Sequence, residues 1–171
     1  MMFKYMGIAA IIIACTTAGL LKSLSLSKRV RELEVFLSAL NFITTEIRYF
    51  SSPTDVIISK LKLNEEYVNL KIFNFCEAEL IKTHDFKMSW GNALESSKPF
   101  LSLNTEDFET LKCFGDTFGT TDSEGEIANC EHYINSLKLR LESARTDKSK
   151  RGRMYSSLGF LVGALFAAVF I

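Results

Sequence analysis

The hydrophobic positions divide this sequence into two apolar ends and a middle with helical periodicity. Residues 5–21 and 154–171 carry no charged side chain, and Lys4 is the one charged residue outside the part between them. In that middle part, apolar residues recur at spacings of three and four, and no segment alternates at period two. The pattern predicts an all-α protein, with a helical bundle between two terminal apolar helices.

The two ends have the lengths of short membrane spans. They hold 17 and 18 uncharged residues, which as helices reach about 26 to 27 Å at 1.5 Å per residue. The hydrocarbon core of a bilayer is about 30 Å thick, so both are short but workable spans. We therefore predict an N-terminal membrane anchor over 1–26, a soluble helical bundle domain over 27–152 and a C-terminal transmembrane helix over 153–171.

Basic residues beside the spans predict the orientation of the domain. Four follow the first span and four precede the second: Lys22, Lys28, Arg29 and Arg31, then Lys148, Lys150, Arg151 and Arg153. Because Lys and Arg are enriched in cytosolic flanks, we expect the domain in the cytosol. In an alternative, residues 12–15 form a lipoprotein processing box, Cys15 is lipidated and the domain lies outside. The apolar run continues to Leu21, which disfavours that alternative.

Small residues follow one line along the second span. Gly159, Gly163 and Ala167 are spaced by four, a pattern that lets two membrane helices approach closely. It predicts a helix-helix contact, either between the two spans or with a partner protein.

Pro53 and Pro99 interrupt the periodic pattern of the middle. We expect one helix over 27–50, and a short second helix with Ser52 as its N-cap and Pro53 in its first helical position. A third helix is predicted to start near Asn64.

Two further helices are predicted before the last one. One covers much of 85–98, and another begins at 104 or 105 and is closed by Gly119. The last helix is expected to open with a capping box of Thr121 and Glu124. It then carries a heptad seam, which we assign to the bundle core rather than to a partner: Ile127, Cys130, Ile134, Leu137, Leu141 and Ala144.

The charges of the middle are unevenly placed. From residue 104 to 131 there are eight acidic residues against Lys112 alone, whereas 138–153 holds seven basic residues against Glu142 and Asp147. The basic end suits anionic lipid headgroups. No basic face with interleaved aromatic residues is present elsewhere, so nucleic-acid binding is not expected.

No motif for catalysis, phosphate binding or metal binding is present. His84 and His132 are isolated and are predicted to be surface residues. Asp122 and Glu126 are four apart, but no further ligand completes a metal site, so a solvated face is the better interpretation. We predict that the protein is not an enzyme and that it has no catalytic residue, metal or cofactor. The cysteines of the helical middle are expected to be reduced and buried: Cys76, Cys113 and Cys130.

Three segments resemble the stage III sporulation protein AB family. They are 40–55, with Glu-Ile-Arg-Tyr-Phe and Pro53; 111–126, with Phe-Gly-Asp-Thr-Phe-Gly and Thr-Thr-Asp; and 150–163, which begins Lys-Arg-Gly-Arg. The likeness spans nearly the whole chain. Phe114 and Phe118 stand where Leu is expected before Gly, and Glu126 stands where Gln is usual.

The resemblance implies a membrane component of the endospore-forming apparatus that links mother cell and forespore, in the mother-cell membrane around the forespore. It also implies a domain similar to the platform proteins of type II secretion, which engage a secretion-type ATPase in the cytosol. Expected partners are that ATPase and other sporulation channel proteins, with no small-molecule substrate. For the ATPase contact we select four acidic residues: Asp116, Asp122, Glu124 and Glu126.

A pore-lining channel subunit is the alternative function. It requires a polar face on the spans, and only four residues qualify: Thr16, Thr17, Ser156 and Ser157. The platform function is therefore preferred.

Overall fold

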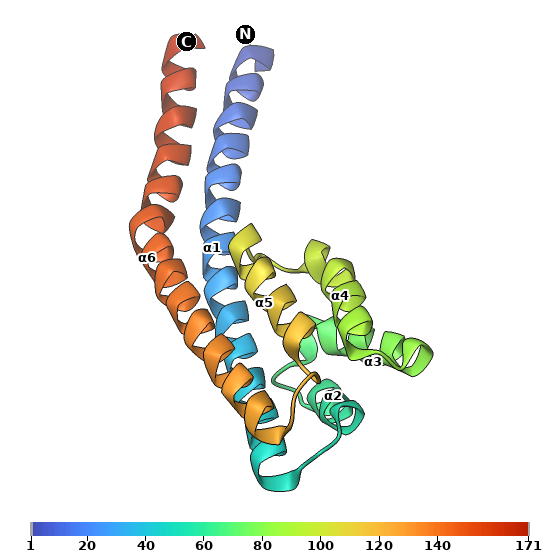
Figure 1. The fold of residues 1–171 in the computed structure, drawn as a ribbon. Coiled ribbons are helices and arrows are strands. Elements are labelled where there is room, and N and C mark those ends of the chain that lie inside the picture. Colours follow the sequence, from blue (N-terminus) through green and yellow to red (C-terminus); the bar gives the residue numbers. More distant parts are fainter. Residues whose placement is uncertain (1, 171) are drawn as a thin grey trace. The chain divides into compact units, whose positions relative to one another are not determined.

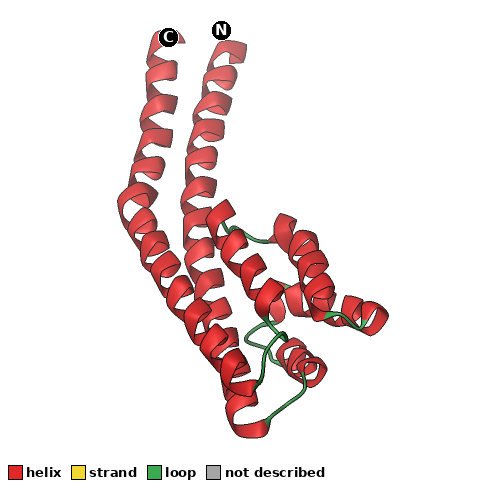
Figure 2. Cartoon of the chain, in the orientation of Figure 1, coloured by secondary structure: helices red, strands yellow, loops and turns green. Residues whose placement is uncertain are grey.

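A computed structural model of the chain describes residues 2–170, and the side chains of residues 13, 14, 16–152 and 154. Every element over residues 2–170 is helical, so the all-α prediction is confirmed (Figure 2). The order is α1 (Met2–Phe50), α2 (Thr54–Leu63), η1 (Val68–Leu70), α3 (Ile72–Thr83), α4 (Phe86–Ser97), η2 (Lys98–Phe100), α5 (Thr105–Thr117) and α6 (Ser123–Phe170), where η1 and η2 are single 3-10 turns (Figure 1).

The helices form two compact units. A terminal unit consists of residues 1–30 with 143–171, and a central unit consists of residues 31–142. The helices α1 and α6 contribute to both, and the other four α-helices belong to the central unit. The predicted soluble domain over 27–152 contains the whole central unit.

Within the terminal unit, α1 and α6 run side by side (Figure 1). The guanidinium of Arg29, which is 5% exposed, lies 3.3 Å from a carboxylate oxygen of Asp147. Farther along, Gly152 is buried, and a Cβ at this position would lie 3.5 Å from Ser23 Oγ. The helix α6 is continuous through Gly152, so this glycine does not interrupt it.

Among the described residues, no helix carries a stretch long and apolar enough to cross a membrane. Most of the predicted spans, 5–21 and 154–171, consists of residues whose side chains are not described. The same holds for some of the residues selected from the sequence: Cys15, Arg153, Gly159, Gly163 and Ala167. The spans and their packing therefore stay predictions.

The core of the central unit is built around Trp90. This side chain is 2% exposed, and its indole Nε1 donates a 2.8 Å hydrogen bond to the carbonyl oxygen of Leu111. The ring of Phe114 packs against it in a T-shaped geometry, with 5.4 Å between the ring centroids. These contacts join α4 to α5.

The heptad seam of α6 also lies in the interior. Cys130, Ile134, Leu137 and Leu141 are at most 6% exposed, which confirms the assignment of the seam to the bundle core. Ile127, at the start of the seam, is half-buried.

Several predicted boundaries are wrong by a few residues. The third helix starts at Ile72 rather than near Asn64, because Lys71 adopts a left-handed conformation with φ of 58° and separates η1 from α3. Ser52 does not cap α2: its hydroxyl donates to Glu46, and Pro53 occupies the N-cap position. A helix that begins at 104 or 105 is confirmed, with a capping box of Asn104 and Asp107.

The start of α6 differs from the expected capping box of Thr121 and Glu124. Instead, Asp122 Oδ1 accepts a 3.0 Å hydrogen bond from the backbone N–H of Gly125. The interaction has the same three-residue spacing but lies one residue later in the sequence.

Candidate functional site

Much of the acidic segment 104–131 is engaged within the fold. Asp107 is fully buried in the capping box of α5, and Glu106 forms an ion pair with Arg140 of α6. Glu131 accepts a 2.7 Å bond from Arg48 of α1. Glu106 and Glu131 link helices, and Asp107 caps one. Fewer acidic side chains are therefore available to a partner than the net charge of the segment indicates.

Glu126 is the clearest case of an internal role. It is only 7% exposed, and its Oε1 accepts hydrogen bonds of 3.0 Å from the backbone N–H groups of both Thr120 and Thr121. Its Oε2 is buried and has no hydrogen-bond partner in the described part of the chain. The predicted solvated face is wrong at this residue, because the carboxylate folds inward to fix the turn between α5 and α6.

Three of the selected carboxylates remain at the surface around this turn. Asp116, in the last turn of α5, lies 3.2 Å from Lys87 of α4, and its side chain is 40% exposed. Asp122 and Glu124 are exposed at the start of α6. We call Asp116, Asp122 and Glu124 the acidic turn; it offers negative charge that two helices and a fixed loop hold in place.

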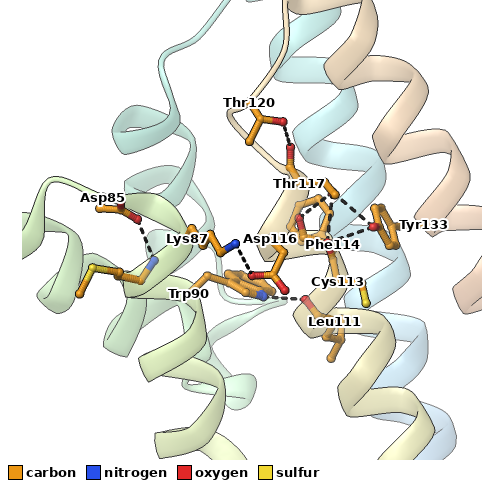
Figure 3. A network of polar contacts seen from close by, with 11 residues as sticks. Asp85, Lys87, Trp90, Leu111, Cys113, Phe114, Asp116, Thr117, Thr120 and Tyr133 are labelled. Carbon is orange, nitrogen blue, oxygen red and sulfur yellow. Dashed lines mark hydrogen bonds and ion pairs between the residues drawn. The ribbon is translucent and has the colours of Figure 1, made fainter.

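Figure 3 shows how Asp116 and the end of α5 are tied to the core. The pair between Lys87 and Asp116 lies beside the hydrogen bond from Trp90 to Leu111. On the α6 side, the hydroxyl of Tyr133 donates a 3.0 Å hydrogen bond to the carbonyl of Cys113. The end of α5 is therefore held by side chains of both α4 and α6.

Two further carboxylates, Glu46 and Glu77, link the first three α-helices of the chain. Glu46 accepts bonds of 2.5 Å from Lys60 and 2.7 Å from Ser52, and these lower its pKa. Glu77 bonds with Lys62 and Ser59, which likewise lowers its pKa. The first network joins α1 to α2 and the second joins α2 to α3.

The described cysteines and histidines form no common site. Burial raises the pKa of Cys76 to about 12 and that of Cys130 to about 11. Cys113 is exposed, so its predicted burial is wrong: it lies on the face of α5 opposite Leu111 and Phe114. His84 and His132 are exposed as predicted. Among the described residues, no group of three His, Cys, Asp or Glu side chains could hold a metal ion.

The basic flank of the second predicted span lies on an exposed stretch of α6. Lys148, Lys150 and Arg151 are all exposed, and Arg151 Nε lies 3.3 Å from Asp147. The exposure leaves these cations available to a charged surface.

The sequence did not predict pairs of residues that are distant from each other along the chain. Lys87 precedes Asp116 by 29 positions, and no periodic pattern marks the two as a pair. Nothing in the sequence indicated the inward position of Glu126, because the backbone N–H groups that it accepts from are placed by the turn.

The fold defines an all-α protein, and Asp122 and Glu124 are exposed at the turn between α5 and α6. The family model for stage III sporulation protein AB matches residues 4–171, so the chain belongs to this family. It is similar to the Stage III sporulation protein AB of Bacillus subtilis (strain 168), with 27% identity over 165 residues that cover 96% of each chain. No solved structure gives a significant match.

Proposed function

We propose that this protein is a non-enzymatic platform or assembly component of a secretion-like channel complex between mother cell and forespore. Two terminal spans hold it in the mother-cell membrane around the forespore, and its helical domain lies in the cytosol. The acidic turn docks a secretion-type ATPase. Membership of a sporulation family supports the setting, and the uncharged ends with their basic flanks support the membrane location.

The observation that carries the docking proposal is the separation of roles among the acidic residues. Glu126 is buried and holds the backbone of the turn, whereas Asp122 and Glu124 remain exposed on the same segment. A charged surface with a fixed backbone steers a partner of opposite charge and fixes its orientation.

The docking proposal is tested by the affinity of the purified full-length protein, in lipid nanodiscs, for the ATPase. The variant Asp122→Asn with Glu124→Lys changes the surface charge by three units and keeps a side-chain acceptor at the N-cap of α6. We expect the Kd to rise by about tenfold, chiefly through a slower association rate that depends on salt.

A matched control applies the same charge change elsewhere. Glu65→Lys with Glu66→Gln alters two exposed acidic residues in the turn before η1 and should leave the Kd unchanged. Equal losses in the two variants, or none in either, would show that the acidic turn is not the docking surface.

The orientation is tested with the exposed native Cys113. An impermeant thiol reagent added to intact cells that express the protein should leave Cys113 unmodified, and permeabilised cells should show modification. Labelling of intact cells would place the domain outside. Intact mass spectrometry then separates this result from the lipoprotein alternative, because lipidation at Cys15 shortens the chain and adds acyl mass.

A further inference from the structure

A groove of about 840 Å³ opens on the central unit, between the start of α2, the α3–α4 turn and the α5–α6 turn. We call it the Ile81 groove. Its volume lies within the range of about 300–1,000 Å³ that is typical of binding pockets. Its lining includes Asp55, Ile81, Asp85, Phe86 and Phe118. None of these residues belongs to the acidic turn, although Phe118 leads into it.

The apolar part of the groove is accessible. Ile81, at the end of α3, is 69% exposed, and Leu80 and Phe86 are half-buried. Phe118 is 5% exposed and packs on Phe86, with 4.9 Å between the ring centroids. The packed rings of Phe86 and Phe118 therefore form the base of the groove, while the side chain of Ile81 is left in solvent. An exposed aliphatic side chain beside packed aromatic rings gives an apolar segment of a partner a place to make contact.

The charge of the groove is negative. Glu77 is compensated by Lys62, and Lys87 is compensated by Asp116. Asp55 and Asp85 are exposed and form no ion pair within the described part of the chain. Two uncompensated carboxylates thus flank an apolar base, and this arrangement complements a segment with an apolar stripe between basic residues.

The backbone at both turns of the groove is held in a left-handed conformation. His84 has φ of 53°, and Gly119 has φ of 83°. Glycine adopts this conformation readily, whereas the Cβ of a histidine disfavours it; His84 is the C-cap residue of α3. Strain of this kind collects at binding sites, and the side chain of His84 lines the groove.

We infer that the Ile81 groove binds an amphipathic helix of a protein partner, with aliphatic residues against Ile81 and Phe86 and Lys or Arg beside Asp55 and Asp85. Placing the apolar face of a helix in a groove between helices is a common mode of peptide recognition. We assign the bound helix to the ATPase that the acidic turn attracts, and this assignment rests on the proposed function.

Site-specific photo-cross-linking tests the groove in the full-length protein, held in phosphatidylcholine nanodiscs. A benzophenone amino acid replaces Ile81, and a control protein carries it at Leu139, which is 74% exposed on α6. The probes are the purified ATPase and a synthetic helical peptide of leucine and lysine; a leucine and glutamate version serves as the charge control. We expect cross-links from position 81 to the ATPase and to the basic peptide only.

Substitutions then measure the two parts of the interaction. Ile81→Ser should weaken binding of both probes at least about tenfold, and Leu139→Ser should leave it unchanged. Asp55→Asn with Asp85→Asn should weaken binding several-fold and reduce its salt dependence. Asparagine keeps the side-chain acceptor that caps α4, so this variant should stay folded.

The outcomes separate the groove from the proposed function. If the wild-type protein binds the ATPase but position 81 cross-links to neither probe, the groove inference is overturned and docking stands. If the ATPase does not bind but the basic peptide cross-links at position 81, docking is overturned and the groove stands. Cross-links from position 81 to a second copy of the chain, or equal capture of the acidic peptide, overturn the inference.

Discussion

Trp90 occupies the space where residue 115 would carry a side chain. A Cβ placed on Gly115 would lie 2.0 Å from Trp90 Cδ1, and the indole is fixed by its hydrogen bond to Leu111. The close approach of α4 and α5 therefore depends on a glycine that faces an aromatic ring. The glycine at position 115 therefore has a packing reason.

Gly115→Ala should destabilise the central unit by about 2 to 3 kcal/mol, because the added methyl group forces the indole out of its position. Denaturant unfolding followed by Trp90 fluorescence measures the loss. Gly91→Ala is the control: it lies in α4 next to Trp90, and a Cβ there meets nothing within 4 Å. It should stabilise the protein by about 0.5 to 1 kcal/mol. Similar stabilities for the two variants would contradict this account of the packing.

Stability should fall in mild acid through Glu46 and Glu77. Their pKa values are lowered in the folded state by hydrogen bonds with Lys60 and Ser52, and with Lys62 and Ser59. The stabilisation is therefore present above the unfolded pKa of about 4.5 and is lost as the pH falls through the folded values. We expect the free energy of unfolding to decrease from about pH 5 downward.

In the variant Glu46→Gln with Glu77→Gln, the free energy of unfolding at pH 7 should be lower by about 1 to 2 kcal/mol. It should also decrease less steeply as the pH falls. Glu79→Gln is the comparison, because the pKa of Glu79 is also lowered, by Lys82, but on an open surface. Its effect should be smaller. An acid profile of the double variant that parallels the wild-type profile would show that these carboxylates do not set the pH dependence.

The thiols should differ sharply in reactivity. Cys113 is exposed, whereas burial raises the pKa of Cys76 to about 12 and that of Cys130 to about 11. Because the thiolate is the reactive form, the two buried residues should resist alkylation at pH 7.5 until the protein unfolds. Peptide mapping after a short iodoacetamide treatment measures this, and rapid modification of Cys76 would show that the α3 core opens readily.

The terminal unit should accept a disulfide between α1 and α6. A Cβ at Gly152 would lie 3.5 Å from Ser23 Oγ, so the side chains at these two positions face each other at close range, as bridged cysteines must. Ser23→Cys with Gly152→Cys should cross-link under mild oxidation, as detected by intact mass.

Leu24→Cys with Gly152→Cys is the matched control, since Leu24 is 64% exposed. It should cross-link far less. Equal yields from the two pairs would indicate that these helices are not held in register. A fixed register is what contact between the two spans through Gly159, Gly163 and Ala167 requires, so this measurement also bears on that proposal.

The sequence by itself determined the helical class, most helix ends and the family. These features are local: apolar spacing of three and four sets a helix, Pro53 and Pro99 mark boundaries, and Asn104 with Asp107 forms a cap within one turn. The break at Lys71 escaped prediction because a left-handed lysine, with φ of 58°, has no sequence signal.

Tertiary structure alone decided which charged and reactive side chains are available. Glu126 is buried, and Asp116 forms an ion pair with Lys87. Cys113 is exposed, and Ile81 and Phe118 line the same groove. Helical periodicity predicts which residues share a face of a helix, but it does not predict which other residues that face contacts. Pairings across tens of residues depend on how helices pack, and packing is set by the fit of all the side chains together.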